Sequence, residues 1–232
     1  MIKEALEKVI NEDMHDIWSI LNSEERRIIV ENFHIHNFKK NQIIYSQGED
    51  AEQLWCLLKG KVKIHKDGVG GRSQIIRLYR PVQYFGFRAF FAGEPHLSSA
   101  SAFEESTLGA LPMNVVSDLI DGNRELAWFF IRELAHNLGG SDTRIVNLTQ
   151  KHIRGRLAEA LIVLRDNYGY EDDEATIKIY MSREDLANLS NMTTANAIRT
   201  LSTFVSEKLI VVDGRRIKII NEASLRRISK FG

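Results

Sequence analysis

The sequence predicts an α+β protein in which an antiparallel β domain comes first, a long helix second and a winged helix-turn-helix last. Three observations carry this prediction. Short apolar runs separated by glycines fill residues 24–111, a seven-residue repeat starts near residue 123, and residues 182–219 hold two helical patterns followed by a hairpin signal. With 232 residues and 44% apolar content, the chain is long enough for two domains.

Composition narrows the class of protein. No segment approaches the ~18 to 20 uninterrupted apolar residues of a membrane span, and acidic side chains come too early for a secretory signal, so we expect a cytoplasmic protein without a membrane partner. The one cysteine, Cys56, excludes an internal disulfide framework and an iron–sulfur cluster held by several cysteines of one chain; we expect it to be buried. The seven histidines show no ligand spacing, so no metal site is predicted.

Charge is balanced overall but not along the chain. Lysine plus arginine and aspartate plus glutamate number 31 each. Residues 1–150 carry 17 basic and 20 acidic side chains, whereas residues 151–232 carry 14 basic and 11 acidic ones. Only the second part has the positive excess that attracts a phosphate backbone.

The first region, residues 24–111, is typical of an antiparallel sandwich or roll. Val62 and Ile64 alternate with lysines, and turn signals recur every ~8 to 12 residues. We therefore predict a sensor-like β domain with N-terminal helices over residues 1–112, then a linker and long helix over residues 113–149, and a second domain over residues 150–232.

The long helix carries a seam with alternating spacings of four and three, the pattern by which one helix packs along another. Its positions are Ala127, Ile131, Leu134, Leu138, Ser141, Ile145 and Leu148. Three repeats fit either a second copy of the chain, which we favour, or the core of the helix's own domain. Gly139 and Gly140 lie inside the seam, where each costs ~1 kcal/mol relative to alanine. They predict either a close helix approach or a bend.

One helix precedes residues 182–203, which carry the strongest signal in the chain, and a second helix begins that segment. The first is predicted over residues 152–167 and carries four apolar residues on one face: Ile153, Leu157, Leu161 and Leu164. The acidic stretch at residues 171–174 then predicts a solvated loop. Ser182, with Asp185 three residues later, resembles a capping box with a shorter acid and predicts a second helix that ends near Leu189.

The next helix completes a helix-turn-helix. Asn191 lies at the corner, where asparagine tolerates a left-handed backbone, and Thr193 is expected to cap the helix. The predicted inward face consists of Ala197, Leu201 and Phe204, with the small Ala187 where the two helices cross. The predicted outward face consists of Thr194, Ala195, Asn196 and Arg199. Recognition helices present such positions to base edges, so double-stranded DNA is the predicted partner, although the same positions also fit an ordinary solvated surface.

A hairpin is predicted directly after this helix, in the position of the wing of a winged helix-turn-helix. Two β-rich runs flank Asp213-Gly214, one of the clearest short hairpin signals. Arg215, Arg216 and Lys218 lie at its tip and flank. They either meet phosphates or keep an exposed hairpin soluble.

These motifs together resemble the cyclic-AMP receptor/fumarate-nitrate regulator (CRP/FNR) family over nearly the whole chain. The turn glycines of the family's cyclic-nucleotide-binding-like β-roll match Gly48, Gly60, Gly71 and Gly86. The resemblance implies a homodimeric transcription regulator that binds a roughly palindromic operator, with an effector between the roll and the dimerisation helix. If it activates transcription, RNA polymerase is a further partner. The implied dimer contacts are Ala127, Ile131, Leu134, Leu138 and Ile145.

The resemblance also assigns DNA contacts by position. Phosphate contacts fall on Ser182, Arg183, Thr193, Asn196, Gly214 and Arg215. Base contacts fall on Thr194, Ala195 and Arg199. Because Ala195 replaces the family's frequent glutamate, the usual operator does not transfer intact. The alternative is a protein-interaction module that has kept the fold and lost DNA binding. Arg199 and the basic wing favour the regulator over this alternative.

The implied effector pocket departs from the family pattern. Members that bind cyclic nucleotides follow a glycine with a glutamate for the ribose and, about ten residues later, an Arg-Ser pair for the cyclic phosphate. Here Phe87 follows Gly86, and the later segment is His-Leu-Ser-Ser at residues 96–99. Without the carboxylate and the guanidinium the charge-assisted hydrogen bonds are lost, so we expect no binding of cyclic AMP. The implied pocket positions are Gly86, Phe87, Arg88, Ser98, Ser99 and Phe130.

Aromatic residues around this region leave two interpretations. They either line a pocket for haem or another flat ligand, or belong to the hydrophobic core, which is the commoner case. The residues are Phe85, Phe87, Phe90, Phe91, Trp128, Phe129 and Phe130. An enzyme is not predicted, because the sequence shows no Ser-His-Asp or Cys-His constellation and no phosphate loop. The glycine-rich residues 68–71 lack the following helix that a dinucleotide site requires.

Overall fold

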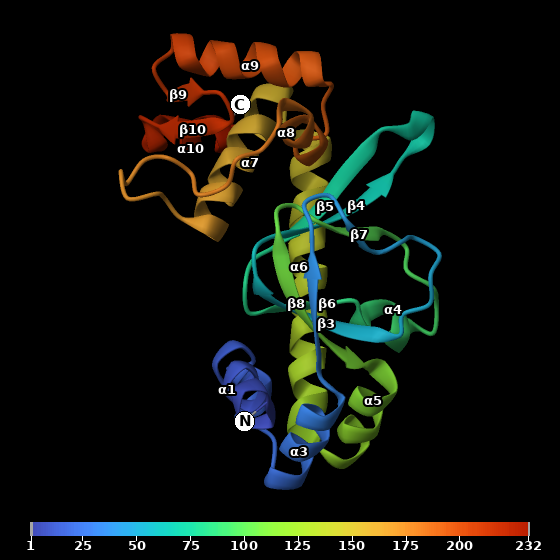
Figure 1. The fold of residues 1–232 in the computed structure, drawn as a ribbon. Coiled ribbons are helices and arrows are strands. Elements are labelled where there is room, and N and C mark those ends of the chain that lie inside the picture. Colours follow the sequence, from blue (N-terminus) through green and yellow to red (C-terminus); the bar gives the residue numbers. More distant parts are fainter. Residues whose placement is uncertain (1, 232) are drawn as a thin grey trace. The chain divides into compact units, whose positions relative to one another are not determined.

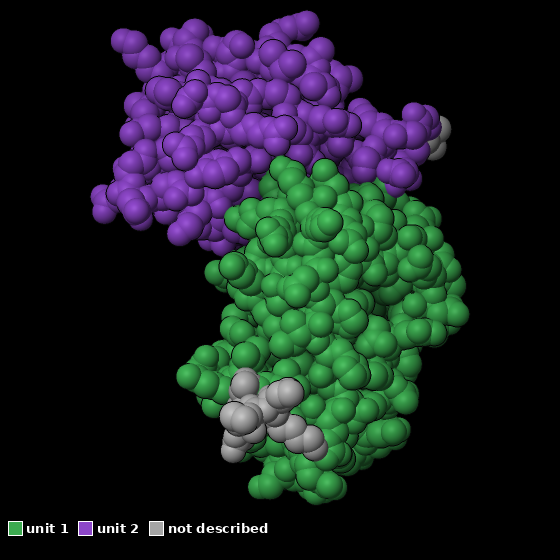
Figure 2. Space-filling view, viewed as in Figure 1, with its two compact units in different colours: residues 1–66, 76–139 green, residues 67–75, 140–232 purple. Residues whose placement is uncertain are grey.

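The computed structural model describes residues 2–231, which form two compact units (Figure 1, Figure 2). The first unit consists of residues 1–66 and 76–139, and the second of residues 67–75 and 140–232. Among the described residues, no helix is both long and apolar enough to cross a membrane. The observed order of β sheets, long helix and winged helix-turn-helix confirms the predicted α+β fold.

Two four-stranded sheets make the β domain. The first has the antiparallel order β1-β8-β3-β6: β1 His34–Phe38, β8 Ser106–Pro112, β3 Gln53–Lys59 and β6 Gln83–Phe85. The second has the order β2-β7-β4-β5: β2 Ile43–Tyr45, β7 Ser99–Ala102, β4 Val62–Asp67 and β5 Ser73–Tyr79, with the short 3₁₀ helix η1 Val69–Gly71 between β4 and β5. Side chains from both sheets share one core, in which Val62 and Ile64 are buried as their alternation predicted.

Three helices precede the sheets: α1 Ile2–Asp13, α2 His15–Trp18 and α3 Ser23–Asn32. The prediction of short strands from residue 24 is therefore wrong over α3. A capping box starts this helix, because the Asn22 side chain accepts the Glu24 and Glu25 amides at 2.9 and 3.0 Å. The Glu25 carboxylate in turn accepts the Asn22 amide at 2.8 Å. This local hydrogen-bonding signature outweighs the β character of the residues that follow.

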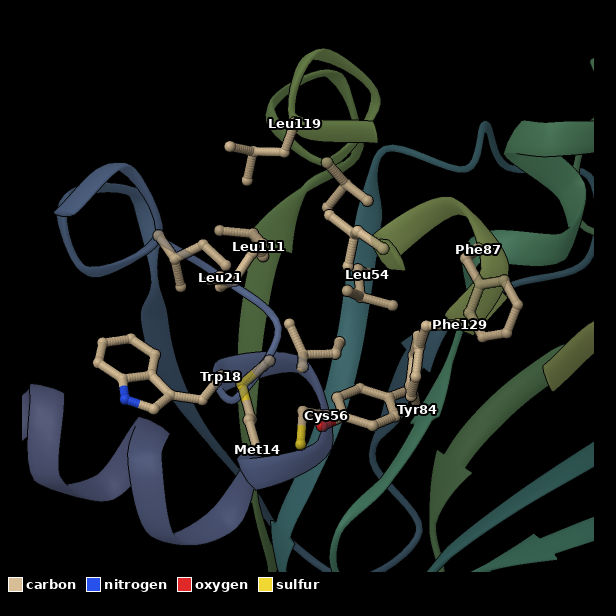
Figure 3. Packing of buried hydrophobic residues seen from close by; sticks show 14 of the residues in the cluster. Met14, Trp18, Leu21, Leu54, Cys56, Tyr84, Phe87, Leu111, Leu119 and Phe129 are labelled. Carbon is tan, nitrogen blue, oxygen red and sulfur yellow. The ribbon is translucent and has the colours of Figure 1, made fainter. Parts of the chain in front are cut away.

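The second core of this unit lies between these helices and the first sheet. Figure 3 shows the Met14 side chain pointing toward Cys56 of β3, and Trp18 and Leu21 belong to the same buried cluster. Cys56 is buried, as predicted, and burial raises the pKa of its thiol. Helices α4 Phe87–Ala92 and α5 Met113–Gly122 also contribute buried side chains to this core. The helix α5 fills a segment that was predicted only as a linker, because its apolar positions follow a helical spacing.

The long helix α6 spans Arg124–Gln150, close to its predicted start at residue 123. The Asn123 side chain accepts the Leu126 amide at 3.0 Å and so starts the helix. Gly139 and Gly140 lie inside the continuous helix, and a Cβ at either would meet no described atom within 4 Å. The predicted close approach therefore does not occur within a single chain.

The second unit is built on α7 Ile153–Tyr168, within one residue of its predicted bounds. Leu157, Leu161 and Leu164 are buried, whereas Ile153 is exposed, contrary to its predicted place on the inward face. The remaining elements are α8 Arg183–Leu189, α9 Thr194–Ser206, β9 Ile210–Asp213, β10 Arg216–Ile219 and α10 Glu222–Phe231.

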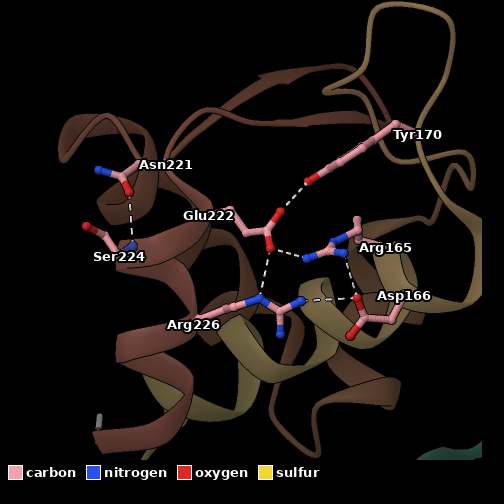
Figure 4. A network of polar contacts seen from close by, with 7 residues as sticks. All are labelled: Arg165, Asp166, Tyr170, Asn221, Glu222, Ser224 and Arg226. Atoms are coloured by element: carbon pink, nitrogen blue, oxygen red, sulfur yellow. Dashed lines mark hydrogen bonds and ion pairs between the residues drawn. The ribbon is translucent and has the colours of Figure 1, made fainter.

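A polar network ties α10 to α7 (Figure 4). The Glu222 carboxylate accepts hydrogen bonds from Arg226 at 2.8 Å, from the Tyr170 hydroxyl at 3.1 Å and from Arg165. Arg226 also pairs with Asp166 at 3.2 Å. The hydrogen bond from Arg226, followed by those from the other partners, lowers the pKa of Glu222 below its ordinary value.

Candidate nucleic-acid interface

The first helix of the helix-turn-helix, α8, starts with the predicted cap. The Ser182 hydroxyl accepts the Asp185 amide at 3.0 Å and donates to the Asp185 carboxylate at 2.7 Å. Ser182 is thus fixed at the helix N-terminus, where unpaired backbone N–H groups attract an anion. Ala187 is buried, as its place at the helix crossing predicted.

The corner between α8 and α9 is held by hydrogen bonds to its carbonyl groups. Asn191 has φ of 50°, the left-handed conformation predicted for it. Arg156 donates to the Asn191 carbonyl at 3.1 Å, and Arg144 donates to the Leu189 carbonyl at 2.9 Å. These two arginines satisfy carbonyls that the helix end leaves without partners, so they fix the angle at which α9 leaves the turn.

The second helix, α9, presents the predicted outward face to solvent. Thr193 caps it by accepting the Asn196 amide at 3.2 Å, and the predicted inward residues are buried. Thr194, Ala195 and Arg199 are exposed, while Asn196 is half-buried. Ile198, which sequence reasoning did not single out, is also exposed. The sequence could have predicted this exposure, because Ile198 lies four residues after Thr194 and residues at that spacing share a helix face.

The predicted wing is confirmed as a hairpin with a two-residue turn at Gly214-Arg215. Arg216 pairs with Asp213 across the strands, and Gly214 has φ of 56°. Arg215 is exposed at the tip and has no hydrogen-bond or ion-pair partner among residues 2–231. By contrast, the Lys218 ammonium lies 3.3 Å from the Asp173 carboxylate, which leaves it less available than predicted.

Arg183 connects α8 to the wing. Its guanidinium donates to the Gly214 carbonyl at 2.8 Å, and its Nη1 is buried. The structure thus brings Arg183 next to the wing tip with Gly214 and Arg215. Apart from Ser182, the remaining predicted contacts lie together at the cap and first turns of α9: Thr193, Thr194, Ala195, Asn196 and Arg199. Arg183, predicted as a phosphate contact, also positions the hairpin turn.

The implied effector positions lie in different environments, and the first three do not offer a free charge to a ligand. Gly86 has φ of 94°, and a Cβ there would lie 2.7 Å from the Gln53 carbonyl oxygen. Phe87 is only 2% exposed and packs edge-on against Phe130 at 5.2 Å between ring centroids. Arg88 is exposed and pairs with Glu94 at 2.6 Å. A buried phenyl ring cannot replace the carboxylate that holds a ribose, and the cation is already neutralised.

In residues 96–99, the later segment of the implied pocket, His96 and Ser99 are likewise engaged with other parts of the protein. The Ser99 hydroxyl accepts the Gln47 amide at 2.9 Å, and Ser98 is half-buried. His96 is buried and stacks on Tyr45 at 3.7 Å between ring centroids. Burial, followed by the charge of Arg88, lowers the pKa of His96, so this ring does not supply a positive charge for a phosphate at neutral pH. These residues do not fit a cyclic phosphate.

A cavity of about 630 Å³ lies elsewhere in the first unit. It is lined by residues 50–53, by residues 89, 90 and 93–95 in and after α4, and by residues 112–114. None of the six implied effector positions lines it. The aromatic cluster near those positions is mostly core, since Phe85, Phe87, Phe129 and Phe130 are buried and each is in ring contact with neighbouring aromatic residues.

The seam of α6 divides into covered and uncovered positions. Ala127 and Leu134 are half-buried, and Leu134 packs on the core of the first unit. Ile131, Leu138 and Ile145 are 50%, 65% and 61% exposed. Large apolar side chains at regular helical spacing are rarely left in water, so this stripe is a candidate contact surface.

Two family models match the chain. The cyclic nucleotide-binding domain matches residues 35–123, and the Crp-like helix-turn-helix domain matches residues 155–228. The chain belongs to the CRP/FNR family. Membership makes it a DNA-binding transcription regulator of the CRP/FNR type, consistent with the capped helices, the fixed corner and the wing described above.

Individual family members are similar at modest identity. A CRP-like cAMP-activated global transcriptional regulator of Mycobacterium tuberculosis is 23% identical over 82% of this chain and 86% of its own length. The fumarate and nitrate reduction regulatory protein of Vibrio cholerae is 26% identical over 82% of this chain and 76% of its own. The structure of FixK2 from Bradyrhizobium japonicum shares the fold with a TM-score of 0.76 and 21% identity, over 84% of this chain and 96% of that one.

Proposed function

We propose that this regulator is a homodimer that binds a roughly palindromic operator through α9 and the wing, under the control of an effector other than cyclic AMP. The observation that carries the proposal is the exposed N-terminal half of α9, with Arg199 on its solvent face and the exposed Arg215 on the wing. A recognition helix enters the major groove with such a face, while a wing meets the backbone beside it.

The residues divide into two roles in this proposal. Arg199 pairs with the O6 and N7 atoms of a guanine, and Thr194 and Ala195 contact neighbouring bases. The backbone contacts come from Ser182, Thr193, Asn196 and the Gly214-Arg215 tip, which lie at helix N-termini or at the exposed turn. Arg183 is assigned a phosphate contact by its position beside the wing, whose turn it also holds.

Selection from random DNA at two salt concentrations tests these roles. Arg199→Ala is expected to cost ~1 to 3 kcal/mol per half-site and to remove the preference at one base pair. Arg215→Ala is expected to weaken binding equally on all sequences and to reduce the salt slope by about 1 per contact. If Arg215→Ala changes the selected motif while Arg199→Ala leaves it intact, the assignment of roles is wrong.

The dimer is supported by the exposed stripe on α6. Ile131, Leu138 and Ile145 recur every seven residues on one face, so two parallel copies of the helix can cover each other's apolar side chains. The expected two-fold symmetry gives the palindromic operator, because each copy then contacts one half-site.

The effector proposal rests on Phe87 and Arg88. Phe87 is buried against Phe130, and Arg88 pairs with Glu94, so neither supplies a free charge for a cyclic nucleotide. Calorimetry with cyclic AMP and cyclic GMP is expected to show no micromolar binding. A micromolar dissociation constant, abolished by Arg88→Ala, would overturn this part of the proposal. Absorption spectra with and without added haem test the other ligand class that the aromatic residues suggested.

A further inference from the structure

The outward face of α9 is unusually rich in methyl groups for a surface that binds DNA. Ile198 is 48% exposed, although the same helix buries Ala197, Leu201 and Phe204 in its core. Ile198 lies four residues after Thr194 and three after Ala195, so the three side chains are neighbours on one helix face. Thr194 and Ala195 are exposed as well. Together they form a patch, here called the methyl patch: Thr194, Ala195 and Ile198.

Hydrogen-bonding groups around the methyl patch are few. The Ser202 hydroxyl, one turn further on, donates to the Ile198 carbonyl at 3.0 Å. The Thr203 hydroxyl donates to the Arg199 carbonyl at 3.1 Å. These hydroxyls are therefore engaged by their own helix, and Arg199 is the one charged side chain on α9 before Glu207, which caps its C-terminus.

In the major groove the only apolar group on a base edge is the C5-methyl of thymine. A branched apolar side chain held on a recognition helix matches that group and gains nothing from the donors and acceptors of the other bases. On the basis of the proposed DNA-binding function, we propose that the methyl patch recognises thymine methyl groups, with Ile198 as the specificity-determining residue. The thymine lies next to the base pair that Arg199 contacts, because the two residues are consecutive on the helix.

Deoxyuridine tests this directly, since it pairs like thymine but lacks the methyl group. The operator selected by the full-length protein is resynthesised with deoxyuridine at each thymine in turn, and affinities are measured by fluorescence anisotropy. Loss of one buried methyl is expected to weaken binding about fourfold per half-site, and so about 15-fold on a symmetric site. One thymine per half-site is expected to show this loss.

Variants link the effect to Ile198. Ile198→Ala is expected to bind thymine DNA as weakly as the wild type binds deoxyuridine DNA, with no further loss when both changes are combined. Val205→Ala is the matched control, because Val205 is 41% exposed on the same side of α9 but two turns further along. It is expected to keep the full deoxyuridine penalty.

The outcomes separate the two proposals. If an operator is selected and no thymine is sensitive to deoxyuridine, the inference is wrong while the DNA-binding function stands. If the penalty persists unchanged in Ile198→Ala, another residue contacts the methyl group and the assignment to Ile198 is wrong. If no sequence is enriched at all, the proposed sequence-specific function fails, and the inference fails with it.

Discussion

Leu138→Ala offers the sharpest test of the dimer. Leu138 is 65% exposed in the single chain, the largest exposed fraction in the α6 stripe. Complete burial of a leucine side chain is worth ~1.5 to 3 kcal/mol, so covering the exposed part contributes ~1 to 2 kcal/mol per copy. Two copies lose ~2 to 4 kcal/mol together, which corresponds to a roughly 30- to 700-fold rise in the dimer dissociation constant.

Sedimentation equilibrium over a wide concentration range measures that constant. Arg132→Ala is the control, because Arg132 is exposed on the same helix but rotated about 120° away from Leu138. It is expected to leave the dissociation constant unchanged. The fold of the variant should be intact, since the side chain removed is in contact with water in the monomer. A dissociation constant that Leu138→Ala does not alter would show that the stripe is not the dimer contact.

Three further predictions concern stability and the wing. Gly86→Ala is expected to lower the free energy of unfolding by ~1 to 3 kcal/mol, because the φ of Gly86 is positive and a Cβ there would clash with a carbonyl oxygen. Gly93→Ala is the control, since the space around Gly93 is open, and thermal melts should show a smaller loss of stability for it. Arg183→Met is expected to speed hydrogen exchange in the turn at residues 213–216 without affecting the amides of α9. The hydrogen bonds that lower the pKa of Glu222 stabilise the fold above the ordinary glutamate pKa, and this contribution is lost as the pH falls from that ordinary value through the lowered one. Glu222→Gln should make acid denaturation less sensitive to pH in that range.

Elements with a strong period or cap were predictable from the sequence. The helix α6 and the wing appear where the seven-residue repeat and Asp213-Gly214 placed them, because each signal is local. The caps at Ser182 and Thr193 were predictable for the same reason, since each bond spans three residues. A local pattern determines a local hydrogen bond, and the fold of the helix-turn-helix follows from a few of them.

Features that depend on distant partners were not predictable. The hydrogen bond from Arg183 to Gly214 joins residues 31 positions apart, and no local pattern in either segment predicts it. The burial of Phe87 against Phe130 likewise arises only when α4 folds against α6. The helix α3 is a different case, since the Asn22 and Glu25 signature was present in the sequence, but our prediction of short strands from residue 24 did not use it.

Five of the fourteen basic side chains of residues 151–232 lie in ion pairs inside the second unit. Arginines 154, 165 and 226 and lysines 151 and 218 all lie in ion pairs with carboxylates of the same unit. Arg199 and Arg215 lie outside these pairs and are exposed, so Arg215 is available to a phosphate and Arg199 to a base edge. Phosphate contacts position the protein and base contacts give specificity, so the sequence preference depends on the α9 face, where one guanidinium lies beside a patch of methyl groups.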